Sequence, residues 1–243
     1  MTALYAIGDI HGQLAQLVEA IDWIEKDGGP AAPIVFLGDY IDRGPDSRGV
    51  LDLLIQGRDA GRNWTFLKGN HDRMFEWFLQ TPSRADPHLF TDLSWLHERL
   101  GGQDTLRSYG LDFSLRRRLS TVHDEALRAV PKAHRDFLAG CRLTFETGSL
   151  FFCHAGIRPG VALRDQKEED LLWIREEFLD FEGSHPKLIV HGHSPVEQPC
   201  HYGNRINFDS GAGYGHPLTA VVFEERNCSI LTAQGRQKIS KAA

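Results

Sequence analysis

The chain has 243 residues, and its 41% of hydrophobic and 25% of charged residues are typical of a soluble globular protein with a full core. A net charge of −6 and a pI near 6.0 argue against a protein that binds nucleic-acid duplexes over a broad surface. No apolar stretch reaches transmembrane length, no signal peptide precedes the first apolar run, and the four cysteines form no CxxC pair. We therefore expect a cytoplasmic protein with reduced thiols and no membrane partner.

The first third of the chain alternates predicted strands with predicted helices. Apolar runs within residues 4–12, 34–44 and 64–72 predict short buried strands that end in glycine-flanked polar residues. Apolar residues then recur at helical spacing over residues 14–24, over 50–55 from a start near Pro45 or Ser47, and over 74–78. This order predicts a βαβαβα arrangement, in which right-handed crossovers place the helices on the faces of the sheet.

Residues 81–140 break this alternation and carry no strong strand pattern. We predict helices near residues 90–100, 105–109 and 122–138, which would form a cap-like insertion beside the strand ends. The aromatic residues Phe90, Trp95, Tyr109 and Phe113 mostly fall at helical spacing among leucines. This spacing favours core packing for most of them.

The rest of the chain is rich in predicted strands. Residues 142–146 and 150–153 flank a Thr-Gly-Ser turn, and residues 201–202 and 205–208 flank a Gly-Asn pair, so each set predicts a hairpin. Further strands are expected within 188–193, 218–223 and 229–232, with one helix at about 168–178 and a frayed tail from about Gln234. With no internal repeat or linker, residues 1–243 are expected to form a single domain with an insertion at about 81–140.

Five of the predicted strands end in residues that commonly bind metals. The strand ends of a layered α/β sheet line one edge, so we expect these side chains to meet in space. Mixed carboxylate, amide and imidazole ligands suit divalent metals, and six are too many for one catalytic ion with an open position. They suit two ions that share a carboxylate, which is a phosphoester-hydrolysis site. The residues are Asp9, His11, Asp39, Asn70, His154 and His193.

The motifs GDIHG, GDYIDRG, GNHD, HAG and HGH occur in this order along the chain. Over about residues 5–219 the sequence resembles the calcineurin-like metallophosphoesterases, in particular the PPP-type serine/threonine phosphatases of compact bacterial and phage form. The resemblance implies an α/β fold, a four-layer αββα sandwich of two mixed sheets flanked by helices. It also implies two divalent ions, with Mn²⁺ preferred and Fe or Zn as alternatives. The first ion would take Asp9, His11 and Asp39, and the second Asp39, Asn70, His154 and His193.

The same resemblance implies catalytic roles for further residues. His71 matches the general acid of the family, and Asp72 matches the carboxylate expected to orient it. Arg43 matches a phosphate-clamping arginine, and Asp42 is expected to support Arg43 or a metal ligand. Arg175 is the best match for a second arginine.

Other polar residues near the motifs are expected to have supporting roles. His191 lies two positions before the matched ligand His193 and is not expected to bind metal. Pro195 stands where other metallophosphoesterases place a further ligand, which supports the two-ion scheme. Asp209 is expected to support the floor of the site, and Tyr214 to form part of its wall.

The predicted reaction is hydrolysis of a phosphate monoester by a metal-bridging hydroxide, without a covalent intermediate. The favoured function is that of a serine/threonine protein phosphatase, with tyrosine as a further substrate, because Asp42 precedes Arg43 as in those enzymes. The alternative is a symmetrical bis(5′-nucleosyl)-tetraphosphatase. A non-catalytic binding module is disfavoured because all six expected ligands are present. The partner is thus a phosphoprotein or a phosphorylated small molecule, and the oligomeric state stays open.

Overall fold

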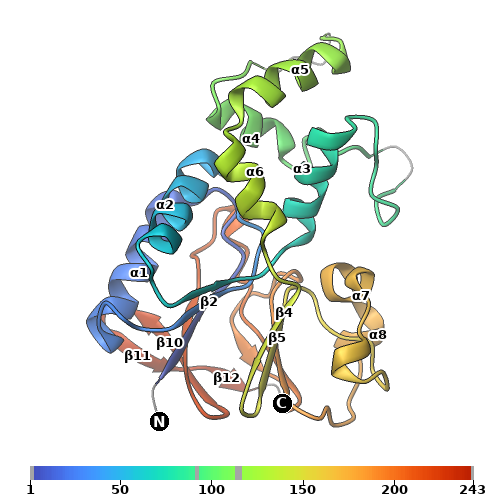
Figure 1. Cartoon of the computed structure of the whole chain (residues 1–243). Helices are drawn as coiled ribbons and strands as arrows, with labels where there is room; N and C mark the ends of the chain where they lie inside the picture. Colours follow the sequence, from blue (N-terminus) through green and yellow to red (C-terminus); the bar gives the residue numbers. More distant parts are fainter. Residues whose placement is uncertain (1–2, 91–92, 113–116, 242–243) are drawn as a thin grey trace.

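The computed structural model describes residues 3–90, 93–112 and 117–241, and its twelve strands form two six-stranded sheets (Figure 1). The strands are β1 (Leu4–Ile7), β2 (Ile34–Phe36), β3 (Trp64–Phe66), β4 (Thr144–Thr147), β5 (Leu150–Cys153), β6 (Leu188–His191), β7 (Cys200–His201), β8 (Arg205–Asn207), β9 (Ala220–Glu224), β10 (Asn227–Thr232), β11 (Gly235–Lys238) and β12 (Ser240–Lys241). The first sheet has the order β11-β10-β9-β1-β2-β3, and the second β12-β7-β8-β6-β5-β4. Both are mixed: β1 pairs parallel with β2 and antiparallel with β9, and β5 pairs parallel with β6 and antiparallel with β4.

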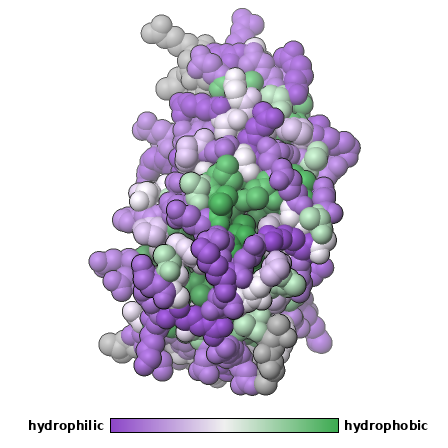
Figure 2. All heavy atoms as spheres, turned by 90° about the vertical axis from the view of Figure 1, so that its left-hand side faces the viewer, coloured by the Kyte–Doolittle hydropathy of each residue, from purple (hydrophilic) through white to green (hydrophobic). Residues whose placement is uncertain are grey.

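Helices cover the outer faces of the two sheets, which confirms the predicted αββα sandwich. The helices are α1 (Leu14–Gly28), α2 (Ser47–Asp59), α3 (Asn70–Gln80), α4 (Gly102–Ser108), α5 (Leu119–Ala129), α6 (Lys132–Ala139), α7 (Glu168–Trp173) and α8 (Glu176–Leu179). Helices α1 and α2 lie against the first sheet, α7 and α8 against the second, and α4 to α6 stand with α3 at one end (Figure 1). Figure 2 shows the face on the left of Figure 1, where hydrophilic side chains surround one hydrophobic area near the centre.

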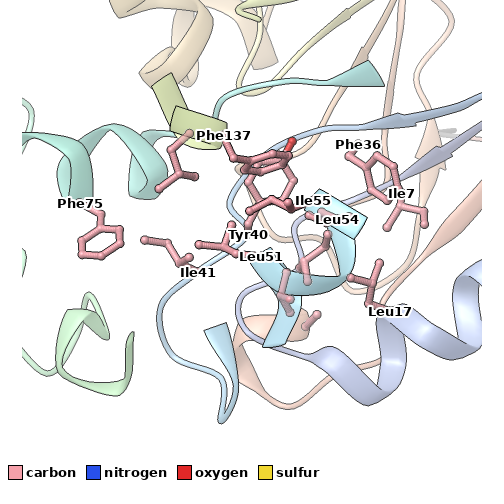
Figure 3. Close-up of a cluster of buried hydrophobic side chains, with 14 of the residues drawn as sticks. Ile7, Leu17, Phe36, Tyr40, Ile41, Leu51, Leu54, Ile55, Phe75 and Phe137 are labelled. Atoms are coloured by element: carbon pink, nitrogen blue, oxygen red, sulfur yellow. The ribbon is translucent and has the colours of Figure 1, made fainter. Parts of the chain in front are cut away.

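Strands β1, β2, β5 and β6 are continuous apolar runs because both faces of the sheet are buried where they lie. In β1, Tyr5 and Ile7 pack with α1 and α2, whereas Ala6 packs between the two sheets. Figure 3 shows Ile7 and the β2 residue Phe36 beside Leu17 of α1. In β5 and β6 the alternation is the same, with one set of side chains between the sheets and the other against α7 and α8.

The predicted helices of the insertion are partly wrong. Residues 95–101 form successive turns instead of a helix, because tertiary contacts replace helical hydrogen bonds: the Gln103 side chain donates to the Leu96 carbonyl at 2.7 Å. The single helix predicted at 122–138 is split into α5 and α6, since Pro131 has no N–H to continue it. The helix predicted at 168–178 is likewise split, at Ile174 and Arg175, into α7 and α8.

The prediction of a frayed tail is wrong. Strand β11 pairs antiparallel with β10 in the first sheet, and β12 pairs parallel with β7 in the second, so the last described residues join both sheets. Arg236 holds β11 further by donating to Asp27 of α1 at 2.9 Å and to Glu224 of β9 at 2.8 Å. All four cysteines are unpaired, as expected. Among residues 3–90, 93–112 and 117–241, no helix is long and apolar enough to cross a membrane.

The interface between the sheets gives a stability prediction. Phe152 is fully buried there, with its ring centre 5.9 Å from that of Phe145 and 5.6 Å from that of Phe223. We expect Phe152→Ala to lower the free energy of unfolding by about 3–5 kcal/mol because it leaves a cavity. Urea denaturation measures this, with Phe90→Ala as the matched control, since Phe90 is 78% exposed. Similar losses in the two variants would contradict the packing.

Candidate metal centre and active site

The loops after β1, β2, β3, β5 and β6 bring the six predicted metal ligands together. All six side chains are buried, and five of them line one cavity of about 110 Å³. The sixth, His154, lies directly behind the cavity wall, with its Nε2 2.9 Å from Oδ1 of Asn70. The convergence is thus produced by the topology, because the strand ends meet at one edge of the sandwich.

The backbone is strained at this convergence. Six residues other than glycine have positive φ in the described part of the chain, and Glu225 alone of them lies outside the site. The other five are His11, Asp39, Asp42, Arg43 and His193, with φ between 46° and 73°. Such conformations are uncommon for these residue types and cluster at functional sites.

Asp39 lies between two histidines. Its Oδ2 is 3.5 Å from Nε2 of His11 and 3.5 Å from Nε2 of His154, and its Oδ1 accepts a hydrogen bond from the backbone N–H of His71 at 3.0 Å. The Asp39 side chain lies so close to the backbone of residue 69 that this position requires glycine, because an added Cβ would stand 2.0 Å from Oδ1 of Asp39. The carboxylate is therefore placed where two cations could share it.

Main-chain carbonyl groups fix which imidazole nitrogens face the cavity. Nδ1 of His11 is 2.8 Å from the carbonyl oxygen of Ile41, and Nδ1 of His154 is 3.0 Å from that of Leu37. A carbonyl oxygen only accepts, so Nδ1 carries the proton in each ring. Each Nε2 then presents a lone pair to the site, as a metal ligand must.

Several lone-pair atoms of the predicted ligands face one another or have no hydrogen-bond partner, an arrangement that suits bound cations. Nε2 of His154 and Oδ1 of Asn70 stand 2.9 Å apart although both present lone pairs. Oδ1 of Asp9 and Nε2 of His193 are buried without a hydrogen-bond partner among the described residues. Buried polar atoms are normally satisfied, so these orphaned oxygen and nitrogen atoms point to divalent ions as their partners.

The electrostatics of the cluster agree with this fit. Burial raises the pKa of Asp9, and the charges of Asp209 and Asp39 raise it further. Burial also raises the pKa of Asp39 to about 7, lowers that of His154 to about 4 and lowers that of His193 strongly. Neutral imidazoles beside crowded carboxylates form a site whose charge bound cations would balance.

The carboxylate that contacts His71 is Asp42. Nδ1 of His71 lies 2.6 Å from Oδ2 of Asp42, and both side chains are buried. The prediction that Asp72 orients His71 is therefore wrong. Asp72 is the third residue of α3, and it accepts hydrogen bonds from the backbone N–H groups of Gly69 at 2.8 Å, Asp39 at 2.9 Å and Tyr40 at 3.0 Å. It joins the loop after β2 to the start of α3.

Asp42 itself is held by residues of the 81–140 segment. The indole N–H of Trp95 donates to its Oδ2 at 2.8 Å, and the hydroxyl of Thr105 donates to its Oδ1 at 2.6 Å. Burial raises the pKa of Asp42, and the hydrogen bonds from Thr105 and Trp95 oppose that shift. These two residues were not expected in the site, although a buried tryptophan N–H needs an acceptor and was a signal for one.

Arg43 reaches into the cavity between two imidazoles. Its Nη1 lies 2.6 Å from Nε2 of His11, and its Nη2 lies 3.0 Å from Nε2 of His71. Its guanidinium carbon also stacks 4.7 Å from the ring centre of Tyr214, which is 59% exposed. The lone pair on Nε2 of His11 can serve only one partner. Coordination of a metal by His11 would therefore require the Arg43 guanidinium to turn away from this nitrogen.

Arg175 and Asp209 complete the lining together with a residue that the sequence did not reveal. Nη1 of Arg175 donates to the Ser194 hydroxyl at 3.0 Å, from the break between α7 and α8. Oδ1 of Asp209 accepts from the N–H of Gly211 at 2.9 Å. Trp173 also lines the cavity, and no local pattern in the sequence marks it for this place.

Two other histidines lie apart from the ligands. The His191 ring turns toward Arg205, and Nε2 of His191 lies 3.4 Å from Nη1 of Arg205. Burial, and then the charge of Arg205, lower the pKa of His191 to about 3. His88 forms a third potential ligand group with Asp86 and Glu169.

That third group is already neutralised by a cation of the chain. Arg73 donates to Asp86 at 2.7 Å and to Glu169 at 2.9 Å, so a metal ion there would have to compete with a buried guanidinium. The two clusters that contain Asp39 are thus the better metal sites.

Relatives of this chain are nucleotide hydrolases by name. A bis(5′-nucleosyl)-tetraphosphatase PrpE of Anoxybacillus flavithermus, described as asymmetrical, is 25% identical over 243 residues, covering 90% of this chain and 89% of its own. The enzyme of the same name from Geobacillus thermodenitrificans is 26% identical over 253 residues, with the same coverage.

Solved structures support the fold. A putative diadenosine tetraphosphatase superposes with a TM-score of 0.65 and 20% identity, covering 95% of this chain and 93% of its own. The cold-active protein-tyrosine phosphatase of a Shewanella species gives a TM-score of 0.60 and 18% identity, covering 99% of this chain and 81% of its own.

The sequence pattern of the calcineurin-like phosphoesterases matches residues 3–227. That span holds every residue of the buried histidine and aspartate clusters that contain Asp39. The chain therefore belongs to the calcineurin-like phosphoesterase family and is a metal-dependent phosphoesterase.

Proposed function

We propose that this phosphoesterase hydrolyses a bis(5′-nucleosyl) tetraphosphate asymmetrically. The relatives that match 90% of the chain carry this activity in their names, whereas the alternative predicted from the sequence was symmetrical cleavage. The main cavity, at about 110 Å³, suits a single phosphate group, because sites that enclose a whole drug-sized ligand measure about 300–1,000 Å³. The rest of the substrate must then lie outside it.

The observation that carries this proposal is a second cavity beside the first. It measures about 330 Å³ and shares Pro195, Gly211 and Tyr214 with the first, so a ligand can extend from one into the other. Arg43 packs on the Tyr214 ring, which is 59% exposed and offers a stacking surface. A nucleobase on such a ring gains about 1–3 kcal/mol.

The metal-binding roles follow the predicted scheme. The first ion would be held by Asp9, His11 and Asp39, and the second by Asp39, Asn70, His154 and His193. Two divalent ions, for which we propose Mn²⁺, neutralise phosphate charge when bound and lower the pKa of a water molecule.

The remaining roles belong to residues around the ligands. Arg43 and Arg175 bind the phosphate oxygens, for which a guanidinium fork is suited. His71 gives its Nε2 proton to the leaving oxygen. Burial, followed by the charge of Arg43, lowers the pKa of His71, and the Asp42 carboxylate beside Nδ1 is the group placed to oppose that shift.

The second candidate is a serine/threonine or tyrosine protein phosphatase. A cavity of about 110 Å³ also suits a phosphate on a protein side chain, and the DYIDRG segment resembles those enzymes. The two candidates share their chemistry and differ in what lies beyond the phosphate.

The substrate assignment predicts a preference. With the Mn²⁺-loaded protein, we expect kcat/KM for diadenosine tetraphosphate to exceed that for a phosphopeptide by at least about tenfold, or roughly 1.4 kcal/mol of transition-state binding. Tyr214→Ala should raise KM for the dinucleotide about tenfold and leave para-nitrophenyl phosphate hydrolysis nearly unchanged. Phe90→Ala is the control, because this exposed aromatic residue lines neither cavity. A preference for the phosphopeptide would assign the function to the second candidate.

The role of His71 predicts a dependence on the leaving group. We expect His71→Asn to lower kcat on phenyl phosphate by about 10²–10⁴-fold, because phenolate needs a proton to leave. The loss on para-nitrophenyl phosphate should be far smaller, since para-nitrophenolate leaves unaided. Steady-state kinetics on both esters and metal analysis of the variant measure this. Equal losses on both esters would instead indicate a purely structural histidine.

A further inference from the structure

The turns and helix at residues 95–108 contact the active-site loop through one carboxylate. Trp95 and Thr105 each donate a hydrogen bond to Asp42, at 2.8 Å and 2.6 Å, and they reach different oxygens. The backbone N–H of Asp42 in turn lies 2.9 Å from the Thr105 hydroxyl oxygen. All three residues are buried, with Asp42 and Thr105 fully enclosed.

These contacts continue to the proposed acid. Oδ2 of Asp42, which accepts from Trp95, is also 2.6 Å from Nδ1 of His71. The opposite ring nitrogen, Nε2, faces the cavity, where Nη2 of Arg43 lies 3.0 Å away. The orientation of the His71 ring, and so the direction of its Nε2, depends on the carboxylate plane of Asp42.

Hydrogen bonds to both oxygens fix that plane. A carboxylate rotates easily about its terminal torsion, so a partner on one oxygen alone leaves the plane free to turn. Thr105 donates to Oδ1 and Trp95 donates to Oδ2. A buried network in which every polar group has a hydrogen-bond partner is rigid. Asp42 also has a φ of 73°, a strained conformation that needs support from its surroundings.

Core packing explains the indole ring of Trp95 but leaves its N–H to be explained. The ring centre lies 5.0 Å from that of Phe75 and 4.7 Å from that of Phe78. Phenylalanine would make similar contacts in that place. The N–H adds one feature, a donor aimed at Asp42.

We propose that Trp95 and Thr105 are positioning residues for His71 and act through Asp42. The 81–140 segment then completes the acid side of the active site, beyond any part it has in covering the site. This inference rests on the proposed function, because it takes His71 as the proton donor.

The test uses substitutions that remove little volume: Trp95→Phe removes one donor, and Thr105→Val removes the hydroxyl that donates to Oδ1 of Asp42 and accepts from its N–H. We expect Trp95→Phe and Thr105→Val each to lower kcat on phenyl phosphate about tenfold, part of the roughly 10²–10⁴-fold that proton transfer contributes. The rate on para-nitrophenyl phosphate, KM for both esters and metal content should stay near wild type. Thr105→Ser should restore the rate because it returns the hydroxyl. Trp23→Phe, in α1 and outside the cavity lining, is the matched control.

A double-mutant comparison separates this role from a structural one. In a His71→Asn background, Trp95→Phe and Thr105→Val should have no further effect on phenyl phosphate, since the group that they position is gone. Equal losses on both esters, or losses that multiply with that of His71→Asn, would overturn the proposal. Thr105→Val gives an independent answer if Trp95→Phe unfolds at a lower temperature. A wild-type protein that hydrolyses neither ester nor diadenosine tetraphosphate would refute the proposed function itself.

Discussion

One buried carboxylate, Asp39, is the constraint on which the rest of the site depends. It lies 2% exposed with Oδ2 3.5 Å from both His11 and His154, where desolvation makes an unbalanced charge costly. Cations on both sides would remove that cost, and the other predicted ligands come from four further loops that end at the same edge. The positive φ of Asp39, 50°, places the group there, so the backbone carries strain in order to hold it.

The packed sheets anchor the loops that carry the predicted ligands. Apolar side chains cover both faces of β1, β2, β5 and β6, and the two strands of the tail, β11 and β12, extend one sheet each. Asp72 then ties the loop after β2 to the start of α3 through three backbone N–H groups. The loops are therefore held by buried contacts where the predicted ligands meet, and the site opens at Tyr214, toward the second cavity.

Local patterns in the sequence were sufficient for the fold class and for the convergence of the ligands, because each strand and its polar end lie within a few residues. Contacts made at a distance were not predictable. The choice between Asp42 and Asp72 as the partner of His71 depends on the direction of their side chains. The turns at 95–101 depend on the hydrogen bonds that Trp95 donates to Asp42 and Gln103 donates to the Leu96 carbonyl. The tail was misjudged because its residues are polar and exposed, and pairing with existing strand edges gives it structure.

The central claim is that Asp39 is shared by two metal ions, and electron paramagnetic resonance of the Mn²⁺-loaded protein tests it most directly. The account predicts two ions per chain by elemental analysis and the spectrum of an exchange-coupled pair, with the coupling lost in Asp39→Asn. A fully active protein that binds one uncoupled ion per chain would contradict it.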